Sequence, residues 1–148
     1  SPWYATAVLA LVCVQGAFGA LTVTMKLFPA IVTLHLLFGM GLLMLLAWQH
    51  EAYRPQPIQV SPTLRRATAV VLVLALMQVA LGGWVSTNYA VLACSSFPQC
   101  QGQWWPEMDW TGGFELWRPL GQLASGEQLT FAALTAIHFA HRLESMLN

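Results

Sequence analysis

Three of the four histidines in this chain lie within apolar sequence, where an ionisable side chain is costly to bury. His35 occurs in "IVTLHLLFGMG", while His138 and His141 occur three residues apart in "AIHFAHRL". Residues three apart share one face of a helix. Inside a membrane helix such residues mark functional sites by default, so we expect ligand or catalytic roles. The simpler alternative is a neutral imidazole hydrogen-bonded to a neighbouring helix.

The spacing of these histidines favours haem over zinc. A zinc protease would need histidines four apart with an intervening glutamate, and this chain lacks that pattern. Imidazoles on facing helices of a bundle suit axial ligation of haem iron. His138 would then be a second metal ligand, or it would adjust the properties of His141 as the ligand. Arg142 could pair with a haem propionate, although pairing with Glu144 or with lipid headgroups is an equal alternative.

Two cysteines lie six positions apart in "CSSFPQCQGQWWP", residues 94–106. A structural zinc site needs four ligands, and this stretch offers only Cys94 and Cys100. A disulfide across five intervening residues is sterically accessible, and a redox couple is the remaining possibility. Tryptophans suit a membrane interface, where they would anchor the loop or form a lid over a cofactor pocket; the loop carries Trp104, Trp105, Trp110 and Trp117.

Composition places these residues in a membrane protein. The 148-residue chain is 57% hydrophobic and only 8% charged, against about 25% charged in soluble domains. Residues 3–25, 27–50 and 67–85 contain no Asp, Glu, Lys or Arg, and each run is long enough to cross a bilayer, which takes about 20 helical residues. We therefore predict an all-α integral membrane helix bundle. Basic residues are few and unclustered, so nucleic acid is not an expected partner.

The predicted organisation is a single membrane domain over residues 1–148. Transmembrane helices are expected at about 3–25, 28–48, 66–86 and 128–148, with a connector at 49–65 and a long loop at 87–127. Pro55, Pro57 and Pro62 are expected to exclude regular helix from the connector.

Basic residues predict the orientation. The connector carries Arg54, Arg65 and Arg66, whereas the turn on the other face carries only Lys26. The long loop has Arg118 among four acidic residues. The positive-inside rule places the connector in the cytoplasm of a bacterial inner membrane protein. The cysteine loop is then periplasmic, where disulfides are stable.

Two segments repeat a short pattern. "QGAFGALTVT" (15–24) aligns with "QVALGGWVST" (78–87), and the two share a glutamine, an alanine, a glycine and the final threonine. Both segments end a helix that runs outward. Small residues at these places allow close helix packing, which indicates a repeated helix pair.

Three stretches together resemble the haem A synthase family, membrane enzymes that convert haem O to haem A. They are "GALTVTMKLFPAIVTLHL" (19–36), "LGGWVSTNYAVLACSSFPQCQGQWWPEM" (81–108) and "AIHFAHRL" (136–143). The resemblance implies an eight-helix protein built from two similar four-helix halves, of which this chain would hold helices three to six. The pairing histidines would lie in helices two and eight, so the fragment alone should not catalyse.

The resemblance also implies roles for individual residues. His35 matches an axial histidine of the half that handles substrate haem, and His141 matches a ligand of the b-type haem in the other half. His138 takes the place that the family's catalytic glutamate has in the symmetric helix. Cys94 and Cys100 match a family disulfide, although "SS" follows Cys94 where many relatives have a proline and an acidic residue.

The implied activity is oxidation of a methyl group of haem O to the formyl group of haem A, for terminal oxidase assembly. Haem b would be the cofactor, and haem O and haem A the substrate and product. Membrane lipid, haem O synthase and a quinol or other electron donor are the expected partners. Two alternatives are a membrane thiol–disulfide oxidoreductase, which would need a second periplasmic cysteine pair, and a non-catalytic b-type haem protein.

Overall fold

The computed structural model describes residues 2–53, 56 and 58–147 and is built from helices. No β-strand occurs in these ranges, which contain only the isolated bridges Cys100–Gln103 and Gln122–Gln128. The elements, in chain order, are α1 (Pro2–Thr24), α2 (Pro29–Ala52), α3 (Pro62–Thr87), the 3₁₀ turn η1 (Ala90–Leu92), α4 (Trp110–Gly113) and α5 (Phe131–Ser145).

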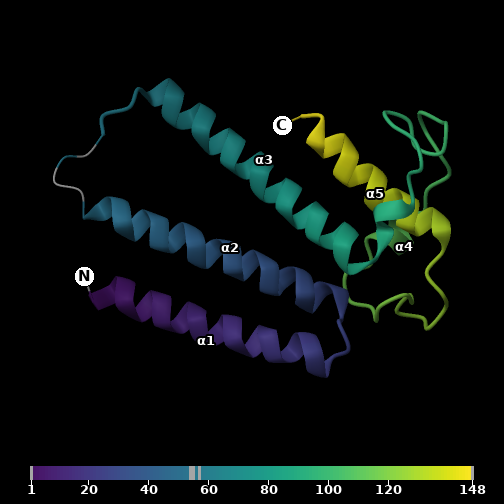
Figure 1. Cartoon of the computed structure of the whole chain (residues 1–148), viewed down its shortest axis with the longest axis horizontal. Coiled ribbons are helices and arrows are strands. Elements are labelled where there is room, and N and C mark those ends of the chain that lie inside the picture. Colours follow the sequence, from purple (N-terminus) through teal and green to yellow (C-terminus); the bar gives the residue numbers. More distant parts are fainter. Residues whose placement is uncertain (1, 54–55, 57, 148) are drawn as a thin grey trace.

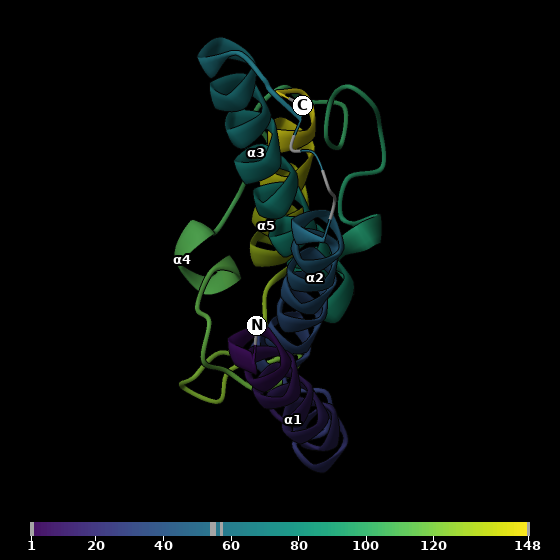
Figure 2. The same ribbon diagram turned by 90° about the vertical axis from the view of Figure 1, so that its left-hand side faces the viewer.

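The three long helices run side by side, with α2 packed against both α1 and α3 (Figure 1). The turn from α1 to α2 and the long segment between α3 and α5 lie at one end of the molecule (Figure 1). From that end α5 runs back along α3, as the side view in Figure 2 also shows. The segment between α3 and α5 therefore forms a cap over the end of the bundle.

Each of α1, α2 and α3 is long and apolar enough to cross a membrane. No residue of the most apolar stretch of α1 is buried, and few are in α2 or α3, so their outer faces are left to contact lipid or other helices. This confirms the predicted all-α membrane class. Helix α5 spans Phe131–Ser145 and has 15 residues, so it begins three residues after the expected start at 128 and is shorter than the three long helices.

The helix ends follow local capping chemistry. The Ser61 hydroxyl accepts a hydrogen bond from the Leu64 N–H at 3.2 Å, and Pro62 occupies the first helical position, where its missing N–H is not needed. The expectation that Pro62 excludes helix was therefore wrong, and α3 begins four residues before the predicted position 66. Likewise, α2 continues to Ala52 instead of ending at 48. Arg54, Pro55 and Pro57, on which the connector prediction also rested, lie outside the described residues.

The buried indole of Trp84 joins α3 to the cap. Its Nε1–H donates to the carbonyl of Gly113 at 2.9 Å, and only 4% of the residue is exposed. The guanidinium of Arg118 lies over the indole ring, 5.5 Å from its centroid, in a cation–π contact. Arg118 is fully buried; that burial lowers the pKa of its guanidinium, while the nearby Glu115 carboxylate opposes the shift.

Replacing Gly113 with alanine should destabilise the cap. A Cβ atom there would lie 2.7 Å from the carbonyl oxygen of Ala133, so α4 would have to move away from α5. We expect a loss of about 1–3 kcal/mol, measured by denaturant unfolding of the full-length protein in detergent. Gly41→Ala is the matched control, because a Cβ there meets no atom within 4 Å. Equal stability of the two variants would contradict this packing.

Candidate functional site

His35 lies on the face of α2 that packs against α1. It is six residues past the helix start at Pro29, a depth of about 9 Å. The Cε1 edge of its ring faces Gly19 so closely that a Cβ built there would be 3.3 Å away. The amide of Gln15, one helical turn earlier, donates to the backbone carbonyl of His35 at 2.9 Å. The imidazole therefore packs against the backbone of α1, because Gly19 has no side chain.

His141 has a closely similar environment between α5 and α3. Its Cε1 atom would lie 3.1 Å from a Cβ built on Gly82. The side-chain Nε2 of Gln78 lies 3.4 Å from the ring Nε2. Thus each histidine faces a glycine and contacts a glutamine on the helix that packs against its own: α1 for His35 and α3 for His141.

Each of the two imidazoles has a buried nitrogen without a hydrogen-bond partner among the described residues. The Nδ1 atoms of His35 and His141 are buried and have no hydrogen-bond partner within the described part of the chain. The same holds for the side-chain oxygens of Gln15 and Gln78. A buried polar atom without a partner costs roughly 1–3 kcal/mol. Such atoms next to imidazole rings mark places where a ligand can offset that cost.

The donor set fits haem better than a bare metal ion. No group of three or more His, Cys, Asp or Glu side chains that could hold a metal occurs among the described residues. A free zinc ion would therefore lack ligands. Haem iron needs only axial ligands from the protein, and imidazole is a common one. The imidazoles of His35 and His141, each placed between two helices, fit that requirement.

His138 and Arg142 contact the cysteine loop. The Nδ1 atom of His138 accepts a hydrogen bond from the N–H of Cys94 at 3.1 Å. Arg142 donates from Nη1 to the carbonyls of Ser96 at 2.6 Å and Gln99 at 3.2 Å. Its guanidinium also lies 5.2 Å from the centroid of the Phe97 ring. Spacing alone did not reveal these contacts, and the haem-binding roles of both residues stay predictions.

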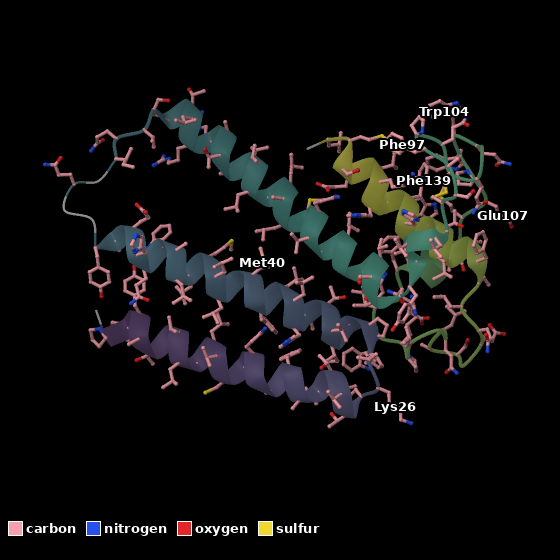
Figure 3. All side chains as sticks on the ribbon, in the orientation of Figure 1. Lys26, Met40, Phe97, Trp104, Glu107 and Phe139 are labelled. Atoms are coloured by element: carbon pink, nitrogen blue, oxygen red, sulfur yellow. A yellow bond between two sulfur atoms is a disulfide. The ribbon has the colours of Figure 1, made fainter. Side chains whose placement is uncertain are left out.

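Cys94 and Cys100 form the predicted disulfide. Cys100 is fully buried and Cys94 is 8% exposed, and both pack against Phe139 of α5. Gln101 adds hydrogen bonds to the carbonyl of Ala93 and the hydroxyl of Thr135. Figure 3 shows Phe97, Trp104 and Phe139 gathered at this end of the molecule. The bridge thus holds the loop onto α5.

The cap tryptophans are mostly exposed, as expected for an interface. Trp104, Trp105 and Trp117 are each about two-thirds exposed. Trp105 stacks edge-on against Phe139 at 5.4 Å, and Trp117 contacts Phe28 in the turn between α1 and α2 at 4.8 Å. The cap therefore contacts α5 and also the turn between α1 and α2.

An apolar cavity of about 390 Å³ lies between α2 and α3 below the cap. Its walls include Leu34, Leu37, Ala80, Trp84 and Trp117. Neither His35 nor His141 lines it, so this space is separate from the two imidazoles.

Arg142→Gln should loosen the disulfide loop. Hydrogen bonds to a charged group contribute roughly 1.5–3 kcal/mol each, and about 1.4 kcal/mol corresponds to a factor of ten, so their loss should speed reduction of the bridge by dithiothreitol by at least about tenfold. The rate is read by maleimide labelling in a Cys13→Ser background, because Cys13 is exposed. Arg65→Gln, at the exposed start of α3, is the control. Unchanged kinetics in the Arg142 variant would contradict the role of these contacts.

Comparison with known proteins adds to this geometry. The family model COX15-CtaA, described as cytochrome oxidase assembly protein, matches residues 1–148. A protein from Shewanella oneidensis named heme A synthase is 38% identical over 146 residues, covering 95% of this chain and 44% of the relative. The chain thus spans less than half the length of that relative. No solved structure shows significant similarity. The chain belongs to the COX15-CtaA family of cytochrome oxidase assembly proteins, the haem A synthase family that its sequence resembles.

Proposed function

We propose that this chain is part of a haem A synthase, a membrane oxidoreductase that converts a methyl group of haem O to the formyl group of haem A. The product would serve terminal oxidase assembly. Membership of the family and the similarity to a protein named heme A synthase support this proposal. Because the chain aligns with only 44% of that relative, the activity is proposed for the longer protein.

The observation that carries the proposal is the pair of histidine environments. His35 and His141 each sit inside a helix pair, each against a glycine, and each with a buried Nδ1 that has no partner in the described ranges. His35 would hold the iron of the haem O substrate, and His141 would hold the iron of haem b. A partner for each of these histidines would come from outside these 148 residues.

Bound haem iron supplies the oxidising and electron-transfer chemistry that an unactivated methyl group requires. The residues of this chain would bind the haem and orient it. The glycines set how far each imidazole stands from the neighbouring helix. The apolar surfaces of the long helices suit a lipophilic substrate. A membrane quinol is the proposed electron donor, and haem O synthase the proposed source of substrate.

The proposed orientation follows the distribution of charge. Arg65 and Arg66 lie at the start of α3, at the opposite end of the helices from Lys26 and the cap (Figures 1 and 3). The positive-inside rule then places the arginine end in the cytoplasm and the cap in the periplasm of the bacterial inner membrane.

A thiol–disulfide relay is less well supported. Thiol exchange requires access to a disulfide sulfur, and Cys100 is fully buried. The remaining cysteine, Cys13, lies on α1 and is exposed. The described residues therefore offer no second pair to receive electrons.

The test uses the full-length protein purified in detergent. His35→Ala and His141→Ala should each remove the low-spin haem signal of one site from the optical spectrum, because the iron loses an axial imidazole. His50→Ala is the matched control, since His50 is exposed in the last turn of α2. Conversion of haem O to haem A, followed by chromatography of extracted haems, should be lost in both site variants and kept in the control.

Two outcomes would overturn parts of this assignment. Persistence of both haem signals in the His35 and His141 variants would remove these residues as ligands. Haem binding without any haem O turnover by the intact protein would indicate a non-catalytic haem protein instead.

A further inference from the structure

The two helix pairs α1–α2 and α3–α5 build the same contact from the same residue types. Gln15 and Gly19 lie four apart on α1, as Gln78 and Gly82 do on α3. Residues four apart lie on one face of a helix. In both pairs this face meets the histidine of the other helix, which is His35 on α2 in the first pair and His141 on α5 in the second. We call this arrangement the Gln–Gly–His contact.

The glycine contacts match closely. A Cβ built on Gly19 would lie 3.3 Å from Cε1 and 3.9 Å from each ring nitrogen of His35. A Cβ built on Gly82 would lie 3.1 Å from Cε1 and 3.7 Å from each ring nitrogen of His141. Both rings thus point the Cε1 edge at the glycine, with the two nitrogens equally far on either side. Two unrelated packing contacts would not be expected to share this orientation.

The glutamine contacts differ in detail. Gln78 approaches the ring nitrogen Nε2 of His141 at 3.4 Å. Gln15 instead donates to the backbone carbonyl of His35, and it fits there because residue 39 is glycine, whose Cβ would lie 3.0 Å from the amide nitrogen. Gln78 therefore contacts the imidazole itself, whereas Gln15 contacts the backbone of the helix turn that carries the imidazole.

We propose that Gly19 and Gly82 are positioning residues for His35 and His141. The inference rests on the proposed function, because it treats both rings as iron ligands. Ligand constellations must be held to within about 0.5 Å and 10–20°. An added methyl group at 3.1–3.3 Å would move the ring by a few tenths of an ångström, which is a large part of that tolerance.

Alanine variants of the full-length protein test this inference. Purified apoprotein is titrated with hemin, and the ferric complex is measured by electron paramagnetic resonance. Gly19→Ala and Gly82→Ala should shift the low-spin g values of one site each and weaken hemin binding by about 10–100-fold, as loss of ligand support does elsewhere.

The chain supplies control glycines on the α1–α2 helix pair. Gly16→Ala lies on α1 and Gly41→Ala on α2, and a Cβ at either position meets no atom within 4 Å. Both controls should reproduce the wild-type spectrum. A merely structural effect of adding a methyl group to these helices would appear in the controls as well.

The outcomes separate this inference from the proposed function. If His141→Ala abolishes a low-spin signal that Gly82→Ala leaves unchanged, the positioning role is overturned while the ligand assignment stands. If the wild-type protein gives no low-spin haem signal, both are overturned. Should Gly82→Ala not elute as a monodisperse protein, Gly19→Ala decides, and an unchanged spectrum counts against the role.

Discussion

The close approach of a glycine backbone to an imidazole ring governs how these helices associate. Leucine or valine on α1 or α3 at that point would hold the neighbouring helix away. With glycine at positions 19 and 82, the rings lie against the helix itself. Helix pairs in membranes gain from such contacts, because burying apolar surface contributes little in lipid. The Nδ1 atom of each ring is buried at this contact.

The cap is fixed to the helices by side-chain hydrogen bonds to its backbone. Polar backbone groups of a loop must find partners where water is scarce. The cap meets this requirement with side chains from α3 and α5: Trp84 donates to Gly113, and Arg142 donates to two loop carbonyls. The disulfide limits the conformations that remain. As a result, an irregular segment of about 40 residues, from α3 to α5, is fixed to the bundle with little regular structure.

Apolar runs predicted the helices because three uncharged stretches of bilayer length have few other stable forms. Helix ends were less predictable, since Pro62 reads equally as an interruption and as a first helical residue, and only the Ser61 cap decides. The histidines and the disulfide could be singled out from residue type. The contacts of His138 and Arg142 could not, because they depend on how the loop folds back. The shared glutamine and glycine were visible in the sequence, but the rings they meet were not.

Helix α5 carries contacts of two kinds within two turns. His138 and Arg142 hold the disulfide loop, and His141 between them faces α3. The loop contacts and the imidazole are therefore carried by one short helical segment, and the bond that closes the loop persists only in an oxidising compartment.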